Sequence, residues 1–413
     1  MEVYFQKVFY LCQKNIIMIK RDNYLKLLRL YKEKPLIKVV SGIRRCGKST
    51  LLEMFQQELL HDGVKKSQII SFNFEDMAFQ NLLTAEALYE HLEKRIDKTK
   101  MNFIFLDEIQ MVSDFERVTN TLFIKKYIDL YITGSNAYFL SSELATLLTG
   151  RYIEIKMLPL SFKEYISAFS QPLDLQQAYE NYAKFGSFPQ SVALYKDNPA
   201  LVSKYVQSIY ETIVYKDIIA RKNIKNNIIL QDIIKFLFDN IGNITTPKRI
   251  ADYLTANQRK ISNHTVENYI SALAESFVIY PVNRFDIKGK NILQTLQKYY
   301  VVDTAFRQLL SDTSPADYGR VLENIVFLEL KRRYDKVWIG KNRENEIDFV
   351  VKDDEGYIYF QVALSVRNEK TRMRELSAFN IRDNYKKIVL TLDPEEGSIN
   401  GIVQKNTFKW LLE

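Results

Sequence analysis

Short apolar runs alternate with amphipathic segments through the first 165 residues of the chain. A helical run at residues 50–60 follows the first apolar run after the segment 42–49. The apolar runs predict strands at residues 35–41, 68–76, 102–110 and 127–136, and a fifth strand inside 147–165. Strands that alternate with helices in this way indicate an α/β fold built on a parallel sheet.

The middle of the chain changes to a helical pattern that ends in a hairpin. Residues 245–257 begin with threonine and place apolar side chains on one helical face, and residues 262–277 form a second amphipathic helix. Residues 278–294 are predicted to form a hairpin with Gly289 at its tip. Two helices followed by a hairpin predict a winged helix in which the hairpin is the wing.

The C-terminal region returns to mixed strands and helices. A helix is predicted at residues 321–334, strands at 336–340, 345–351 and 359–366, a helix and a strand within 372–394, and a closing segment at 406–412. The strands at 345–351 and 359–366 are joined by a polar turn that contains glycine, so we expect a second hairpin there.

The composition mainly excludes certain classes of protein and of site. Of the 413 residues, 46% are hydrophobic and 26% are charged, and no apolar run approaches the roughly 20 residues that span a bilayer. With two cysteines and three histidines, neither a disulfide framework nor a zinc site is expected, which favours a cytoplasmic protein. Residues 1–17 lack the features of a signal peptide and are expected to be an extension or to follow from a misplaced start ahead of Met18.

The net charge of +8 is unevenly distributed. Residues 201–300 hold 14 Lys and Arg against 8 Asp and Glu, which fits either an anionic partner such as double-stranded DNA or a solvated helical surface. The cations that could contact phosphates lie on the predicted wing and before the second helix: Lys288, Lys290, Arg259 and Lys260. The outward face of that helix is polar but hardly basic, with Asn263, His264, Glu267 and Asn268.

The most specific motif is VVSGIRRCGKST at residues 39–50, between the first strand and the first helix. It matches the phosphate-binding P-loop G-x-x-x-x-G-K-[S/T] in the strand–loop–helix context that the motif requires. The glycines let the backbone turn and present N–H groups to phosphate, and Lys48 is expected to reach the β- and γ-phosphates. The predicted nucleotide-binding residues are Gly42, Ile43, Arg44, Arg45, Cys46, Gly47, Lys48, Ser49 and Thr50.

Polar residues at the ends of later strands complete the predicted site. Asp107 ends an apolar strand and is predicted to hold Mg²⁺ together with Ser49, while Glu108 is suited to polarise the attacking water. Asn136 ends the fourth strand and could contact the γ-phosphate or that water. Arg151 could sense nucleotide in its own subunit, act in trans on a neighbour, or stabilise the fold. Glu108, Asn136 and Arg151 are therefore the candidate catalytic residues.

The chain resembles AAA-type ATPases of an archaeal and bacterial ATP-binding family whose C-terminal half is a domain of unknown function of the DUF4143 type. The motifs that carry the resemblance occur in the order GIRRCGKST, FNFED, FLDEIQ, ITGSNA, LTGR, LPLSFKEY, YKDII, KYYVVD and GRVLENIVFLEL. The resemblance covers residues 18–413, and it implies ATP as the nucleotide. After an N-terminal extension and helix (1–35), the resemblance implies an AAA+ (ASCE-type) P-loop core (36–165), a helical segment (166–240), a winged-helix-like domain (241–300) and a nuclease-like domain (301–413).

The C-terminal acids resemble those of the PD-(D/E)xK nucleases. Glu323 lies on a predicted helix, and Asp348 lies on a strand with Glu346 on the same face. The next strand of such a nuclease carries acid-x-Lys, whereas this chain has Gln361-x-Ala363. Because glutamine lacks the charge for a divalent ion and alanine lacks the amine, we expect this domain to be inactive and to serve in structure or in binding a partner.

The sequence therefore predicts an ATP-binding, Mg²⁺-dependent ATPase that acts as a nucleotide-driven switch, with double-stranded DNA a candidate partner through residues 245–300. An ATP-regulated protein-interaction module without DNA binding is the alternative. A residual metal-dependent nuclease is a third reading. No membrane contact is expected, and an oligomer stays open because Arg151 could act in trans only if copies of the chain associate.

Overall fold

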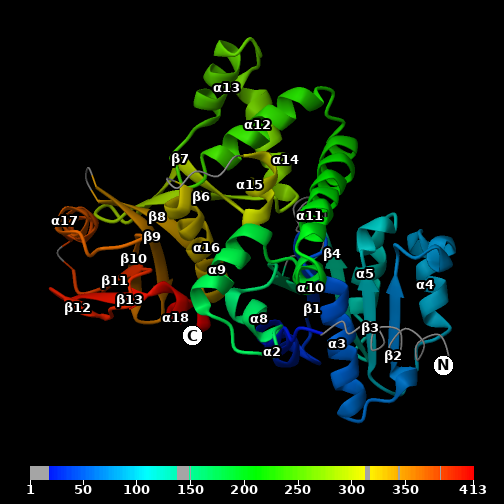
Figure 1. The fold of residues 1–413 in the computed structure, drawn as a ribbon. Coiled ribbons are helices and arrows are strands. Elements are labelled where there is room, and N and C mark those ends of the chain that lie inside the picture. Colours follow the sequence, from blue (N-terminus) through cyan, green and yellow to red (C-terminus); the bar gives the residue numbers. More distant parts are fainter. Residues whose placement is uncertain (1–17, 137–147, 149, 312–316, 343–344, 382) are drawn as a thin grey trace. The chain divides into compact units, whose positions relative to one another are not determined.

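The structure is a computed structural model that describes residues 18–136, 148, 150–311, 317–342, 345–381 and 383–413 (Figure 1). The predicted extension at residues 1–17 lies outside the described residues. The chain divides into an N-terminal unit, residues 20–159 with 275–277, and a C-terminal unit that holds residues 160–274 and 278–413. Among the described helices, none is long and apolar enough to cross a membrane.

Five parallel strands form the sheet of the N-terminal unit, in the order β2-β3-β4-β1-β5. The strands are β1 (Ile37–Ser41), β2 (Ile69–Asn73), β3 (Asn102–Asp107), β4 (Ile128–Gly134) and β5 (Tyr152–Lys156). The helices are α2 (Asp22–Tyr31), α3 (Lys48–His61), α4 (Ala85–Glu93) and α5 (Phe115–Phe123), with short 3₁₀ helices η1 (Lys66–Gln68), η2 (Met77–Leu82) and η3 (Ile109–Met111). The five predicted strands and the parallel α/β fold are confirmed, and β4 lies between β1 and β3.

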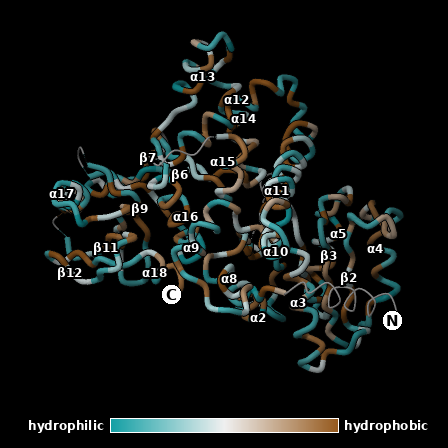
Figure 2. Tube along the Cα trace, in the orientation of Figure 1, coloured by the Kyte–Doolittle hydropathy of each residue, from teal (hydrophilic) through white to brown (hydrophobic). Residues whose placement is uncertain are grey.

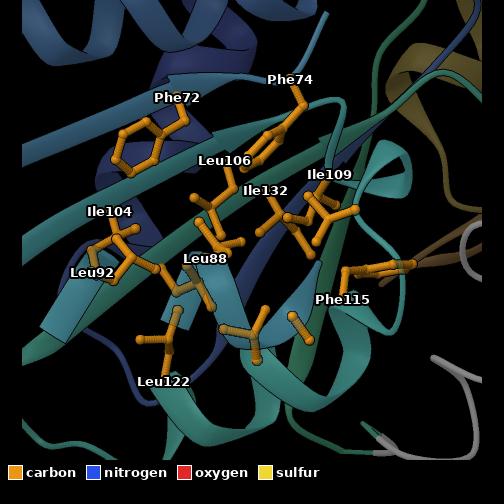
Figure 3. Packing of buried hydrophobic residues seen from close by; sticks show 14 of the residues in the cluster. Phe72, Phe74, Leu88, Leu92, Ile104, Leu106, Ile109, Phe115, Leu122 and Ile132 are labelled. Carbon is orange, nitrogen blue, oxygen red and sulfur yellow. The ribbon is translucent and has the colours of Figure 1, made fainter. Parts of the chain in front are cut away.

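Helices cover this sheet on both faces, which explains why its strands are nearly continuous apolar runs. Leu106 of β3 belongs to the cluster that includes Leu88 of α4 and Leu122 of α5 (Figure 3). Phe105 points to the other face, because successive side chains of a strand alternate. There its ring lies 6.4 Å from that of Phe55 in α3, measured between centroids. Both sides of β3 are therefore core.

A buried ion pair joins β1 to β4 within this apolar sheet. Lys38 donates a hydrogen bond to Asp129, and the two side chains are 0% and 1% exposed. Asp129 also accepts hydrogen bonds from the Tyr131 hydroxyl at 2.7 Å and the Glu33 N–H at 2.9 Å. Burial lowers the pKa of Lys38 below its ordinary value, although Asp129 counteracts part of this effect. Removing either partner would leave the other charge buried without compensation, which strongly destabilises a fold.

The C-terminal unit contains an eight-stranded mixed sheet in the order β12-β13-β11-β10-β9-β8-β6-β7. Its strands are β6 (Ile279–Asp286), β7 (Asn291–Val301), β8 (Val337–Asn342), β9 (Asn345–Asp353), β10 (Gly356–Val362), β11 (Lys386–Thr391), β12 (Gly397–Ile399) and β13 (Ile402–Asn406). The predicted hairpin near residues 345–366 is confirmed as the antiparallel pair β9 and β10.

Helices make up the rest of the C-terminal unit. They are α8 (Phe162–Ser167), α9 (Leu175–Phe185), α10 (Pro189–Asp197), α11 (Ala200–Thr212), the π-helix η4 (Ile213–Ala220), α12 (Asn227–Asp239), α13 (Pro247–Ala256), α14 (Asn263–Glu275), α15 (Thr304–Leu310), α16 (Tyr318–Arg333), α17 (Glu369–Ser377) and α18 (Thr407–Leu412). Buried residues run through the middle of α16, whereas α17 is largely hydrophilic (Figure 2). Helix α16 therefore belongs to the core and α17 to the surface.

The elements of the predicted winged helix are present, but the hairpin has a further neighbour. Helices α13 and α14 form as expected, and β6 pairs with β7 in antiparallel orientation. Strand β6 also pairs in parallel with β8, so the hairpin is part of the eight-stranded sheet. The expected domain boundary at residues 300 and 301 falls inside β7. The winged-helix assignment itself stays a prediction.

Substituting Asp129→Asn should destabilise the N-terminal unit by about 3–5 kcal/mol, because it leaves the Lys38 ammonium buried without its partner. Urea denaturation followed by circular dichroism measures the loss. The matched control is Arg117→Ala, which breaks an ion pair with Glu86 whose side chains are 70% and 66% exposed. That control should cost less than about 1 kcal/mol. Equal losses in the two variants would contradict a structural role for the buried pair.

Candidate functional site

The P-loop, residues 42–47, leads from the carboxyl end of β1 to the amino end of α3. A Cβ atom on Gly42 would stand 2.2 Å from the carbonyl oxygen of Met157, so only glycine fits there. Gly47 has a φ of +103°, a left-handed conformation that glycine adopts without strain. The two glycines of the motif are therefore explained by a close backbone approach and by a positive φ.

The amino end of α3 is suited to an anion. Gly47 is the N-cap residue and provides no side-chain hydrogen bond, and the first turn contains no acidic residue. The first N–H groups of a helix have no partner within the helix, and the helix dipole is positive at this end. A phosphate group would satisfy both the hydrogen bonds and the charge.

Lys48 begins α3, and its side chain folds back over the loop. Its Nζ donates to the carbonyl oxygens of Gly42 at 3.1 Å and Ile43 at 3.4 Å. The same atom lies 3.4 Å from Oε1 of Glu108. Burial alone would lower the pKa of Lys48, but nearby carboxylates, Glu108 foremost, raise it above the ordinary value. The loop therefore carries a charged ammonium where the motif requires one.

Asp107 ends β3 and is buried. Its carboxylate accepts a hydrogen bond from the Thr133 hydroxyl in β4, and the Ser49 hydroxyl in α3 lies close enough to lower its pKa. Burial raises the pKa of Asp107, and the two hydroxyls counteract that effect. The structure thus brings together Ser49 and Asp107, the two predicted Mg²⁺ ligands, and their oxygen atoms are of the kind that Mg²⁺ prefers. Sequence analysis did not single out Thr133, which holds Asp107 in place.

Glu108 follows in a left-handed conformation, with a φ of +52° and a ψ of +46°. Its N–H donates to the Thr133 hydroxyl at 2.9 Å, and its carboxylate accepts a hydrogen bond from Gln110. Burial would raise the pKa of Glu108, but Lys48 and the hydrogen-bond donors outweigh it, so the pKa lies below the ordinary value. Glu108 is therefore an ionised carboxylate, as a base must be. Strained backbone of this kind is enriched at active sites.

Asn136 lies two residues beyond the end of β4 and is 3% exposed. Because β4 lies between β1 and β3, Asn136 follows the strand that separates the P-loop from Asp107. Its neighbour Ser135 lies 3.5 Å from Nε2 of Gln110, the residue that donates to Glu108. Asn136 is thus at the same edge of the sheet as the other predicted site residues.

The remaining P-loop residues are divided between core and surface. Ile43 and Cys46 are fully buried, and burial raises the pKa of the Cys46 thiol. Arg44 pairs with Glu75 at 2.6 Å, after the end of β2. Arg45 and Thr50 are exposed, and Arg45 has a φ of +68°. The loop is therefore anchored by two buried apolar side chains, while Arg45 is exposed and the Arg44 side chain is only 19% exposed beside Glu75.

Arg151 lies at the opposite end of the sheet from the P-loop. It precedes β5, and its carbonyl accepts a hydrogen bond from the N–H of Ile37, the first residue of β1. Its guanidinium donates to Asn120 of α5 and lies 5.7 Å from the centre of the Phe123 ring. The strand register therefore separates Arg151 from the phosphate-binding edge, and a role on a neighbouring copy stays a prediction.

Residues predicted to face DNA are exposed in the C-terminal unit. Asn263, His264, Glu267 and Asn268 are exposed on α14, and Lys288, Lys290, Arg259 and Lys260 are exposed on the hairpin and before α14. The side chain of Arg259 lies 3.4 Å from the Asp232 carboxylate, which reduces its net positive field.

The nuclease-like acids of the C-terminal unit also come together. Glu323, Glu346 and Asp348 surround the ammonium of Lys298 on β7, which begins the segment KYYVVD but was given no role in the site. No local pattern in the sequence signals this contact, because Lys298 precedes the acids by 25 residues or more.

Comparison with known families assigns two parts of the chain. Residues 34–166 match the model of an AAA domain, and residues 176–317 match a domain of unknown function, DUF8612. The AAA-type core is thus confirmed, whereas the DUF4143-like and nuclease-like assignments are not. A Walker-type ATPase of Pyrococcus abyssi has a similar fold, with a TM-score of 0.50 and 16% identity over 71% of this chain and 95% of that one.

Two relatives are similar over nearly the whole chain. An uncharacterized protein of Haemophilus influenzae is 38% identical over 401 residues, which are 96% of this chain and 99% of that protein. An uncharacterized protein of Methanocaldococcus jannaschii is 31% identical over 383 residues, which are 89% of this chain and 82% of that protein. The chain therefore belongs to the family of AAA-domain proteins that these bacterial and archaeal relatives represent.

Proposed function

We propose that the N-terminal unit is a Mg²⁺-dependent ATPase. One arrangement carries this proposal: the Ser49 hydroxyl of the P-loop motif lies close enough to the Asp107 carboxylate to lower its pKa, and the Lys48 ammonium lies 3.4 Å from the carboxylate of Glu108, the next residue. A cation for phosphate, two oxygen ligands for Mg²⁺ and an ionised base are thus gathered at one edge of the sheet. This donor set fits a bound nucleoside triphosphate and its metal.

Each residue has a separate role in the proposed reaction. The N–H groups of the P-loop and the ammonium of Lys48 bind the β- and γ-phosphates, and Ser49 and Asp107 hold Mg²⁺. Bound Mg²⁺ supplies charge neutralisation for the transferred phosphoryl group. Glu108 accepts a proton from the attacking water, and Asn136 orients that water. The left-handed backbone of Glu108 directs its carboxylate toward Lys48.

The contact between Lys48 and Glu108 couples nucleotide binding to the base. In the structure these charges lie 3.4 Å apart, and Lys48 is the first cause that lowers the pKa of Glu108. Phosphate oxygens compete with Glu108 for the ammonium, so nucleotide binding weakens the ion pair. A carboxylate released from a cation is a stronger base. We infer that the base is activated when nucleotide reaches the loop.

The proposed switch acts on double-stranded DNA. Exposed cations at the tip of the β6–β7 hairpin, Lys288 and Lys290, and in the turn before α14, Arg259 and Lys260, support this partner. The exposed face of α14 supports a protein partner instead, because it has uncharged amides and Glu267 but no lysine or arginine among its four outward residues. Measuring ATP hydrolysis in the presence of DNA distinguishes a DNA partner from a protein partner.

Glu108→Gln should lower ATP turnover by about 100-fold or more while ATP binding is retained, because the amide cannot accept the proton of the attacking water. Phosphate release gives the rate, and a fluorescent ATP analogue gives the affinity. Glu75→Gln is the matched control, since it removes an acid that pairs with Arg44 near the loop but lies outside the proposed chemistry. Retention of full turnover in Glu108→Gln would rule out this residue as the base.

Arg151→Ala should leave turnover per folded molecule within about twofold of the unsubstituted protein, because Arg151 lies at the amino ends of the strands. Its loss should cost about 1 kcal/mol of stability through the contacts with Asn120 and Phe123. Rates are measured over a range of protein concentrations. A turnover that rises with concentration in the unsubstituted protein and not in Arg151→Ala would instead establish action in trans.

Replacing Lys288 and Lys290 with alanine should weaken DNA binding and reduce the slope of log affinity against log salt by about 2, one for each lost phosphate contact. Fluorescence anisotropy with a labelled duplex at several salt concentrations measures the slope. A variant in which the exposed residues Lys352 and Lys370 are both replaced with alanine serves as the control. Its net charge equals that of the variant at Lys288 and Lys290. Equal slopes in the two variants, or no binding of DNA at low salt, would favour the protein-interaction alternative.

A further inference from the structure

A buried lysine lies where three carboxylates converge in the C-terminal unit. Nζ of Lys298 stands 3.0 Å from Glu323, 2.8 Å from Glu346 and 3.8 Å from Asp348, measured to the nearest carboxylate oxygens. The Lys298 side chain is 4% exposed. The four residues come from β7, α16 and β9, so a single ammonium joins three elements of the unit.

Protein donors already use the carboxylate oxygens that face inward. Oε1 of Glu323 accepts from Lys298 and also from the Tyr300 hydroxyl at 2.6 Å. Oδ2 of Asp348 accepts from the N–H of Val362 at 2.8 Å, while its Oδ1 faces Lys298. The cluster therefore has its hydrogen bonds supplied by the chain itself.

Gln361, which stands where a nuclease of this kind carries its last acid, is also hydrogen-bonded within the protein. Oε1 of Gln361 accepts from the N–H of Asp348 at 3.3 Å, and its Nε2 donates to Glu375 at 2.8 Å. Gln361 is thus a neutral bridge between β9 and α17, and its one oxygen already accepts a backbone N–H. Ala363 is buried in an apolar cluster and offers no polar atom.

A nuclease-like fold implies a divalent cation at these acids, but the residues do not fit one. Mg²⁺ requires near-octahedral oxygen ligands at about 2.0–2.1 Å, whereas Oε1 of Glu323 and Oδ2 of Asp348 are hydrogen-bonded to protein donors and Oε1 of Glu346 pairs with Lys298. A metal ion among the same carboxylates would also lie within a few ångströms of the Lys298 charge, and like charges repel. Among the residues that the structure describes, no three or more His, Cys, Asp or Glu side chains are arranged to hold a metal.

We propose that Lys298 replaces the divalent cation of this carboxylate cluster, so that the C-terminal unit joins β7, α16 and β9 through an internal ammonium and does not require a metal. The ammonium donates to the surrounding carboxylates and has no lone pair with which to deprotonate water. The cluster is accordingly an ionic junction and not a centre for phosphodiester hydrolysis.

The surrounding carboxylates keep Lys298 charged, and a backbone loop packs closely against one of them. Burial would lower the pKa of Lys298, but Glu323, Asp348 and Glu346 raise it well above the ordinary value. Burial and the charge of Glu323 raise the pKa of Asp348. A Cβ on Gly242 would stand 3.1 Å from the Glu323 carboxylate, so the loop after α12 also packs closely on the junction.

Solvent ions have access to the cluster, which makes the proposal testable. A polar pocket of about 380 Å³ is lined by Glu346, Asp348, Gln361 and Glu375. Removing the ammonium with Lys298→Met leaves three converging carboxylates next to this pocket. Because the variant keeps all three carboxylates and loses the positive charge that repels a cation, it should bind Mn²⁺ at least about 10-fold more tightly than the unsubstituted chain.

The experiment measures Mn²⁺ binding by the paramagnetic resonance signal of the free ion, on the full chain without nucleotide. Lys352→Met, on β9 and exposed, is the matched lysine control and should behave like the unsubstituted protein. Adding Asp348→Asn to Lys298→Met should abolish the new Mn²⁺ site. A folded Lys298→Met variant, verified by circular dichroism, that gains no Mn²⁺ site would overturn the proposal.

A second comparison decides the matter if Lys298→Met does not fold. The unsubstituted protein and Asp348→Asn should bind Mn²⁺ equally and should both leave plasmid DNA intact in Mn²⁺ and Mg²⁺. Equal binding and uncut DNA support the internal ammonium. A Mn²⁺ site or a DNA-cleaving activity that is present in the unsubstituted protein and lost in Asp348→Asn would show that the cluster is a metal-dependent nuclease with its lysine moved to β7.

Discussion

The hydrogen bond that Asp107 accepts from Thr133 is the interaction on which the candidate site depends. It ties β3 to β4 at the edge of the sheet where the Ser49 hydroxyl of the P-loop helix lies close enough to lower the pKa of Asp107. The parallel register makes this possible, because it brings the carboxyl ends of β1, β3 and β4 to the same edge. Thr133 also binds the N–H of Glu108, so the same side chain positions both acids. The proposed metal ligand and the proposed base are therefore fixed relative to each other.

Two buried lysines illustrate how the surroundings decide what an ammonium does. Lys48 faces Glu108 at 3.4 Å and the carbonyls of its own loop, beside a helix end that favours anions. Its partners can be exchanged for phosphate oxygens, and we propose that this exchange links nucleotide binding to catalysis. Lys298 faces three carboxylates within 3.8 Å. Loss of the lysine or of these carboxylates would leave a buried charge without its partner. The first lysine is suited to a reaction and the second to holding a fold.

Local patterns in the sequence predicted the elements and motifs well. The P-loop and the five strands of its sheet follow from short apolar runs and from one motif with fixed spacing. The helices α13 and α14 were predicted because each has a start signal and an apolar face. In all of these cases the deciding information lies within a few residues of the element concerned.

Contacts between distant segments could not be predicted in the same way. Thr133 resembles any strand residue until the register places it beside Asp107, and Arg151 is separated from the P-loop only by that register. Pairing of β6 with β8 makes the expected wing part of a larger sheet, and no local pattern distinguishes an exposed wing from such a strand. The contact of Lys298 with the acids of α16 and β9 also joins segments that are distant in the sequence, so no local pattern predicts it.

Steady-state phosphate release from ATP by the purified full chain, with Mg²⁺ and then with excess chelator, tests the central claim most directly. The account predicts turnover that requires Mg²⁺, disappears in the chelator and returns when Mg²⁺ is restored. Protein that is folded by circular dichroism, binds ATP and releases no phosphate at any Mg²⁺ concentration would contradict the assignment of Glu108 and Asp107 to catalysis. The P-loop would then serve binding alone.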